Sequence, residues 1–122
     1  MSTIPAADDV LKREVEVLPL PTVADLLGLP ITRVHQMLRD GHLLALRRDK
    51  ILSVPAEFLT EDGEVVKHLA GTVTVLKDGG YSVEEVLRWL FTEDDSLPGT
   101  PIAALRSDRS REVKRRAQAM AF

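Results

Sequence analysis

The stretch LLGLPITRVHQMLRDGHLLALRRDK, residues 26–50, decides the predicted fold of this chain. Apolar residues recur in it at helical spacing, two glycines interrupt it, and a basic segment follows the second glycine. Gly28 and Gly41 are typical of helix ends, because glycine adopts the left-handed conformation that closes a helix at little cost. The stretch therefore predicts the end of one helix, a complete second helix and the start of a hairpin.

The residues around Gly28 predict a pair of helices joined by a short turn. Thr22 and Asp25 have the spacing of a capping box, which satisfies the first free amides of a helix. Pro30 has a fixed backbone angle that suits a first turn, so we predict the second helix from there to Asp40. Because the connection is only about three residues long, the two helices must cross at a steep angle, as in a helix-turn-helix unit.

The second helix has an apolar side and a polar side. At about 100° of rotation per residue, one side carries the residues that we expect to be buried: Ile31, Val34, Met37 and Leu38. The opposite side and its flanks carry polar side chains: Thr32, Arg33, His35, Gln36, Arg39 and Asp40. Arginine can form two hydrogen bonds to guanine, and glutamine can form two to adenine, so this side is a candidate reader of DNA bases. A solvated helix face is the alternative explanation.

The segment HLLALRRDKILSVP, residues 42–55, predicts two short strands around a tight turn at Asp49-Lys50. The tip of this hairpin is basic, with Arg47, Arg48 and Lys50. A basic hairpin directly after a recognition helix has the placement of a wing, which reaches a neighbouring groove or the DNA phosphates. The alternative is that these charges protect an edge hairpin from aggregation.

The two ends of the chain differ in their patterns. Residues 1–18 alternate charged and small residues without a helical stripe, and we expect a flexible tail there. The run HLAGTVTVLKDGGY, residues 68–81, is ambiguous, because TVTV favours a strand while the spacing of Leu69, Val73 and Leu76 fits a helix. We predict a helix that ends at the Gly-Gly pair. The whole of residues 59–122 is then a helical domain.

Further helices are predicted in this C-terminal part by their capping residues. Ser82 and Glu85 have the spacing of a capping box, and Thr100 precedes a short helix that begins at Pro101. A last helix has an inner face of Val113, Ala117 and Met120. Trp89 and Phe91 are predicted to anchor the core, with a role in binding a protein partner as the alternative.

Composition excludes several classes of function. The chain of 122 residues has no cysteine, which excludes disulfides and cysteine catalysis and favours the reducing cytoplasm. No apolar run approaches the ~20 residues of a membrane span, so no membrane association is predicted. The three histidines lack metal-ligand spacing, and we predict neither a metal nor a cofactor. Since no nucleophile elbow or phosphate-binding glycine loop is present, the chain is predicted not to be an enzyme and to have no catalytic residues.

The distribution of charge matters more than the total. The formal net charge of -3 argues weakly against a nucleic-acid partner, but residues 30–50 contain five basic and two acidic side chains. Residues 106–116 contain six basic and two acidic ones. Because the Debye length is ~8 Å at physiological salt, a partner near one basic segment responds mainly to that segment. For the second segment, contact with flanking DNA, neutralisation of the acidic loop around Asp94 and simple solvation all stay open.

The order of elements in residues 21–55 resembles the winged helix-turn-helix readers of the MerR and excisionase type. In those proteins a helix, a three-residue turn, a recognition helix, a Gly-x-Leu exit and a basic hairpin follow in this order. Pro30 stands where a serine or threonine usually begins the second helix. The segment LRWLFTEDDSLPGTPIAALRSDRSREVKRRAQAM, residues 87–120, is similar to the C-terminal module of the Xre/MbcA/ParS antitoxin group. Its matching positions are Trp89, Leu90, Leu97, Gly99, Pro101 and Leu105.

The two parts together resemble a small family of bacterial winged-helix DNA-binding proteins. The resemblance implies a regulator, and some members of that family are targets of serine/threonine kinases. A kinase would act here on the N-terminal tail, where Ser2 and Thr3 lie. Any exposed hydroxyl would be accessible in the same way.

The sequence thus predicts a mainly α fold with a small β-hairpin: a winged helix-turn-helix at residues 19–58 packed on a C-terminal helical bundle. The predicted function is sequence-selective binding of double-stranded DNA by a transcriptional regulator, with residues 31–40 in the major groove and residues 47–50 on the backbone. One alternative is an antitoxin-like adaptor whose C-terminal bundle binds a protein partner. Another is a recombination accessory or architectural factor that bends DNA. The patterns decide neither the target sequence nor whether the chain is a monomer or a dimer.

Overall fold

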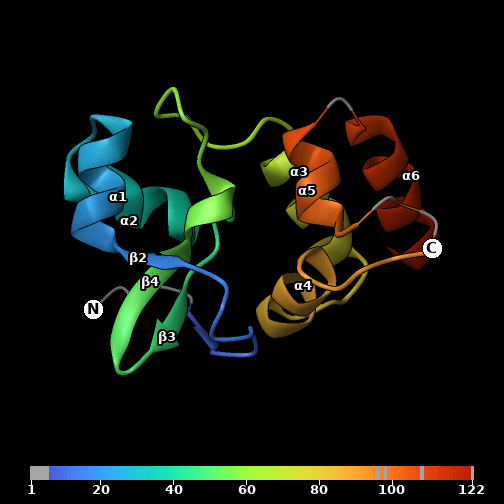
Figure 1. Ribbon diagram of the computed structural model, residues 1–122, viewed down its shortest axis with the longest axis horizontal. Helices are drawn as coiled ribbons and strands as arrows, with labels where there is room; N and C mark the ends of the chain where they lie inside the picture. The colour runs from blue at the N-terminus through green and yellow to red at the C-terminus, as the bar shows by residue number, and fades with distance from the viewer. Residues whose placement is uncertain (1–5, 96, 98, 108, 122) are drawn as a thin grey trace.

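The described part of the chain forms two lobes, one with a four-stranded sheet and two α-helices and one with four α-helices (Figure 1). The computed structural model describes residues 6–95, 97, 99–107 and 109–121. The elements of the first lobe are β1 (Ala7–Asp8), β2 (Val17–Pro19), α1 (Leu20–Leu27), α2 (Ile31–Arg39), β3 (Leu46–Arg48), β4 (Ile51–Pro55) and the 3-10 helix η1 (Ala56–Phe58). Those of the second are α3 (Leu69–Asp78), α4 (Val83–Leu90), α5 (Pro101–Arg106) and α6 (Ser110–Ala121). The predicted fold class, mainly α with a small β component, is confirmed.

The helix-turn-helix is formed by α1 and α2. Gly28 ends α1 in the left-handed conformation with φ 66°, and its amide donates to carbonyls of that helix. The predicted capping box at Thr22 is wrong, since α1 begins at Leu20 after Pro19 without a side-chain cap among the described residues. Strand β2 runs directly into α1, and Pro21 in the first turn has no amide hydrogen that needs a partner.

The wing is the hairpin of β3 and β4. Both turn residues have positive φ, 52° for Asp49 and 67° for Lys50. This is the pattern of a type I′ turn, whose twist matches that of a two-residue hairpin. The predicted hairpin and its turn are therefore confirmed. The strands pair antiparallel, with Arg47 opposite Leu52.

The N-terminal segment is part of the sheet, in which the strand order is β1-β3-β4-β2. Strand β1 pairs parallel with β3, and β2 pairs antiparallel with β4. The prediction of a flexible tail at residues 1–18 is thus wrong for the two strands. A strand of two or three residues is too short to show alternation, and its partners are distant in the sequence, so no local pattern could reveal it. Ser2 and Thr3 lie outside the described residues.

The helical prediction for the ambiguous TVTV run is confirmed by α3. Leu69, Val73 and Leu76 are fully buried on one side of the helix. The hydroxyl of Thr72 is buried, and it donates to the carbonyl of His68 one helical turn earlier, so it has a hydrogen-bond partner. None of the helices in the described ranges is long and apolar enough to cross a membrane.

The remaining caps also form as predicted. The Glu85 amide donates to the Ser82 hydroxyl at 3.2 Å, and the Ser82 amide donates to the Glu85 carboxylate at 3.0 Å. These hydrogen bonds, above all the one from the backbone of Ser82, lower the pKa of Glu85. Thr100 caps α5 by accepting from the amide of Ala103 at 3.2 Å.

The two lobes are joined by an apolar contact and a pair of hydrogen bonds. Phe58 of η1 is fully buried, and its ring centroid lies 5.7 Å from that of Phe91 just after α4. Arg106 of α5 donates from Nη1 to the carbonyls of Glu57 and Leu59, at 2.7 Å and 2.6 Å. These contacts hold the second lobe against η1, which follows the last residue of β4 and lies at the end of that strand away from the Asp49-Lys50 turn.

Candidate nucleic-acid interface

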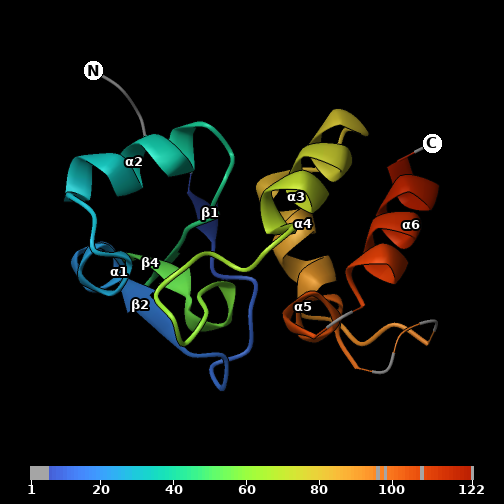
Figure 2. The ribbon, with the colours of Figure 1, turned by 90° about the horizontal axis from the view of Figure 1, so that it is seen from above.

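The polar side of α2 faces solvent. Thr32, Arg33 and Arg39 are exposed, while His35 and Gln36 are half-buried. On the opposite side of the helix Val34 and Leu38 are buried in the core, and these two contacts hold the helix against the first lobe. Helix α2 lies at the outside of the first lobe (Figure 2). Its hydrogen-bonding side chains lie on the side opposite Val34 and Leu38.

Ile31 departs from the expected pattern. It was predicted on the buried side of α2, but 37% of its surface is exposed. It is the first residue of the helix, where no preceding helical turn covers the side chain. An exposed isoleucine at the start of a recognition helix can contact the methyl group of thymine, because the first residues of such a helix contact base edges.

Three polar side chains at the end of α2 are joined by hydrogen bonds. The Gln36 amide nitrogen donates to both carboxylate oxygens of Asp40 at 3.1 Å, and its oxygen accepts from Arg39 at 3.2 Å. The spacing of three and four residues brings these side chains together on one helix face. The amide of Gln36 is thereby oriented, and the Arg39 guanidinium is held over the same face.

Arg47 and Lys50 of the wing are exposed, but Arg48 is not. The Arg48 side chain is only 10% exposed, and its Nε donates to the Asp9 carboxylate at 2.7 Å. Its Nη1 donates to the carbonyl of Val15 at 2.6 Å and its Nη2 to that of Lys12 at 3.1 Å. Since the guanidinium is held by the N-terminal segment, Arg48 does not extend into solvent with Arg47 and Lys50, and its role as a DNA contact stays a prediction.

Strand geometry explains why neighbouring arginines differ. Successive side chains of a strand point to opposite faces of the sheet, so Arg47 and Arg48 cannot both face solvent on the same side. Arg48 points toward the segment that follows β1, and its hydrogen bond lowers the pKa of the Asp9 carboxyl. Sequence reasoning treated the basic run as one cluster and did not apply this alternation.

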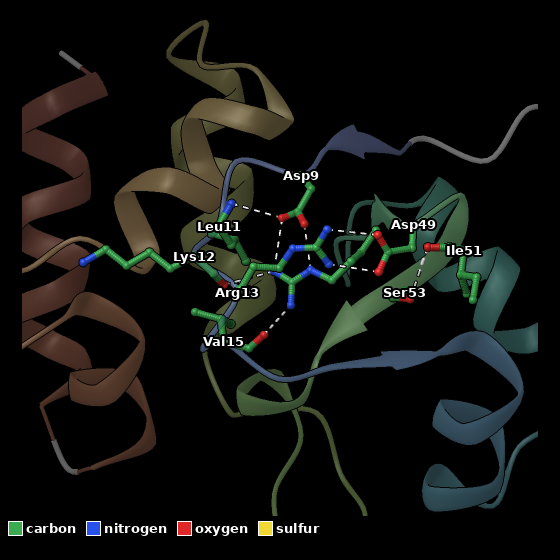
Figure 3. Close-up of polar contacts among 9 residues, drawn as sticks. Asp9, Leu11, Lys12, Arg13, Val15, Asp49, Ile51 and Ser53 are labelled. Atoms are coloured by element: carbon green, nitrogen blue, oxygen red, sulfur yellow. Dashed lines mark hydrogen bonds and ion pairs between the residues drawn. The ribbon is translucent and has the colours of Figure 1, made fainter.

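Arg13 is a cation at the wing tip that sequence reasoning missed. Its two terminal nitrogens donate to the two carboxylate oxygens of Asp49, each at 2.9 Å (Figure 3). The two side chains are 69% and 66% exposed, so solvent reaches the pair. The hydrogen bond from Arg13 lowers the pKa of Asp49. The partners are 36 residues apart, and no local signal in the sequence relates them.

The basic C-terminal cluster is partly occupied by contacts within the protein. Arg106 joins the lobes as described above, and Arg116 donates to the carboxylate of Asp94 at 3.2 Å. Arg109 lies 3.6 Å from Glu112, one turn away. Neutralisation of the acidic loop is therefore the role that the structure supports for Arg116. The other cations of the cluster are exposed: Arg111, Lys114 and Arg115.

No group of three histidine, aspartate or glutamate side chains in the described residues is arranged to hold a metal ion. The candidate site is thus an exposed polar surface made of α2 and the wing.

Comparison with known proteins places the chain in a family. One family model, described as DNA-binding protein Rv2175c, wHTH domain, matches residues 3–59. A second, described as Rv2175c C-terminal domain of unknown function, matches residues 66–121. The curated relative "DNA-binding protein Rv2175c" of Mycobacterium tuberculosis (strain ATCC 25618 / H37Rv) is 47% identical over 134 residues, covering 100% of this chain and 92% of the relative. The chain belongs to the Rv2175c family.

A solved structure of that family agrees with the fold described above. The NMR structure of Rv2175c has a TM-score of 0.89 to this chain at 47% sequence identity. The comparison covers 99% of this chain and 91% of the other. The prediction of a winged helix-turn-helix family followed by a helical C-terminal part is thereby confirmed at the level of the family.

Proposed function

We propose that this chain binds double-stranded DNA, with α2 in the major groove and the tip of the β3–β4 wing on the adjacent phosphate backbone. The observation that carries the proposal is the exposed polar face of α2. The apolar side of the helix packs on the first lobe, and the exposed cations of the wing follow α2 in the chain. The name of the curated relative and the description of the family model for residues 3–59 support it. The resemblance to readers of the MerR and excisionase type supports the same placement.

The side chains of α2 divide into two proposed roles. Arg33 and Arg39 are exposed and can each form two hydrogen bonds to guanine, and Gln36 can do so to adenine. Thr32 and His35 lie beside them and position the helix through the sugar-phosphate backbone. Reading of this kind selects particular sequences, and we infer that the chain is a transcriptional regulator.

The wing tip supplies contacts that do not depend on sequence. Arg47 of β3 and Lys50 of the turn are exposed, and Arg13 of the N-terminal segment lies at the same tip. Contacts of this kind to phosphates release condensed counterions, so binding weakens as salt is raised.

Alanine substitutions in α2 and in the wing are expected to have different consequences. Arg33→Ala should cost about 1–3 kcal/mol in binding to the preferred sequence and relax selectivity at one base pair. Arg47→Ala should weaken binding to all sequences alike and reduce the slope of log affinity against log salt by about one unit. Fluorescence anisotropy with the preferred duplex and a scrambled one, at several salt concentrations, measures both effects. If neither substitution changes binding, the assignment of this face is wrong.

Asp49→Asn is expected to tighten DNA binding severalfold and to steepen the salt dependence by about one unit. The substitution removes an anion from the wing tip and releases Arg13, which then faces the phosphates. Asparagine adopts the left-handed conformation readily, so the turn at φ 52° is kept.

The matched control for this test is Arg13→Gln, which removes the cation of the same pair. It should weaken binding, whereas Asp49→Asn should strengthen it. Unchanged affinity in both variants would show that the wing tip does not approach DNA.

A further inference from the structure

The end of α2 meets the second lobe at a small hollow. It has a volume of about 200 Å³ and is lined by Arg39 of α2, by Asp40 and Gly41 just after this helix, and by residues of α3 that include Thr74 and Lys77. Figure 2 shows the C-terminal end of α2 next to α3. The hollow therefore connects the end of the polar face of α2 with polar side chains of the second lobe.

A larger groove continues from this hollow along the second lobe. It lies between α3 and α6, has a volume of about 640 Å³ and shares Thr74 with the hollow. The two helices lie side by side, since the Tyr81 hydroxyl after α3 donates to the carbonyl of Met120 at 3.1 Å. The cations that line the groove are Arg111 and Lys114.

The charges along this path are mainly positive, and one cation among them, Arg39, already donates to a neighbour, Gln36. We call the four cations Arg39, Lys77, Arg111 and Lys114 the α3–α6 strip. Among the described residues, Lys77, Arg111 and Lys114 form no ion pair or hydrogen bond from their side chains. Two carboxylates border the hollow, and one of them, Asp40, already accepts from Gln36. No carboxylate lines the larger groove in the described part of the chain.

We propose that the α3–α6 strip binds the phosphate backbone of DNA that flanks the base pairs read by α2. This rests on the proposed function, and it assigns a role to the C-terminal domain. The six residue steps of α3 from Gly71 to Lys77 span about 9 Å. DNA carries one charge per about 3.4 Å along each strand, so a path of this length faces about three successive phosphates. A row of cations that begins at α2 therefore matches, in charge and length, the phosphates of a DNA strand that continues beyond the base pairs read by α2.

The test compares Lys114→Gln with Arg115→Gln on two duplexes. The two residues are adjacent on α6 and both exposed, but only Lys114 lines the groove, whereas Arg115 lines a separate hollow with Glu112. One duplex covers only the site under α2 and the wing, and the other extends it by about one helical turn, ~10 base pairs, on each side. Lys77→Gln serves as a second variant of the strip.

The expected result is specific to the longer duplex. Lys114→Gln and Lys77→Gln should each weaken its binding about three- to tenfold near 0.1 M salt and reduce the salt slope by about one unit. Binding to the short duplex, and binding of Arg115→Gln to both, should stay at the wild-type level. Equal affinities of Lys114→Gln and Arg115→Gln for the longer duplex would show that the α3–α6 strip does not bind flanking DNA, and would leave the proposed function intact. Failure of the wild type to bind either duplex would overturn both.

Discussion

Replacing Phe58 with alanine is expected to lower the free energy of unfolding by about 3–5 kcal/mol. The side chain is fully buried, and its ring packs against that of Phe91 at a centroid distance of 5.7 Å. Truncation removes the apolar surface that the ring buries and leaves a cavity at the point where the lobes meet. Urea denaturation followed by circular dichroism measures the loss.

The same variant tests whether the two lobes unfold together. Trp89 is the chain's single tryptophan and lies in α4 of the second lobe, so its fluorescence reports on that lobe. Phe58 belongs to the first lobe. If its substitution shifts the urea midpoint by the same amount in Trp89 fluorescence and in circular dichroism, the two lobes unfold together. A Trp89 transition that stays at the wild-type midpoint would contradict the coupling. Phe58→Leu, which keeps most of the apolar volume, should cost clearly less.

Arg48→Met is expected to destabilise the protein by about 2–4 kcal/mol. The substitution keeps an apolar stem of similar length but removes the charged donor of the Asp9 carboxylate and the side-chain donor of the Val15 carbonyl. The amide of Leu11 still donates to Asp9, and the amide of Val15 still donates to the Lys12 carbonyl. The matched control is Arg47→Met, one residue away on the opposite, exposed face, which should change stability by no more than about 0.5 kcal/mol. Equal losses in the two variants would contradict the structural role of Arg48.

The contribution of Arg48 should also depend on pH. The hydrogen bond from Arg48 holds the pKa of Asp9 below its ordinary value, so the ionised carboxylate is favoured in the folded state. A lowered folded pKa gives stability that is fully present above the unfolded pKa of about 3.9 and is lost as pH falls through the folded pKa. Denaturation at pH 7 and near pH 3 should therefore show a smaller difference between wild type and Arg48→Met at the lower pH. A difference that is the same at both values would show that Asp9 is not the partner that matters.

The parts of the fold that were predictable depend on residues close together in the sequence. The stop at Gly28, the turn at Asp49-Lys50 and the capping box of Ser82 and Glu85 each involve at most four consecutive positions. Local conformational preferences decide such features, and a single sequence displays them directly. Helix α3 was predictable for a related reason, because its apolar spacing outweighed the strand preference of its threonines and valines.

The parts that were missed depend on partners far along the chain. Strands β1 and β2 are too short for a pattern, and they exist because β3 and β4 offer free edges to pair with. The contacts of Arg48 with Asp9 and of Arg13 with Asp49 span 39 and 36 residues. Strand alternation alone predicts that the side chains of Arg47 and Arg48 lie on opposite faces of the sheet. It does not predict which of the two faces solvent. The polar face of α2 was predictable, because it follows from helical rotation.

Binding of the full chain to a pool of randomised duplexes, with sequencing of what is retained at rising salt, tests the central claim most directly. The account predicts a linear loss of log affinity with log salt, together with an enriched motif whose selectivity at one base pair is lost in Arg33→Ala. Retention without any motif would contradict base reading by α2 and leave only backbone binding. Absence of binding even at low salt would contradict the assignment of this surface to DNA altogether.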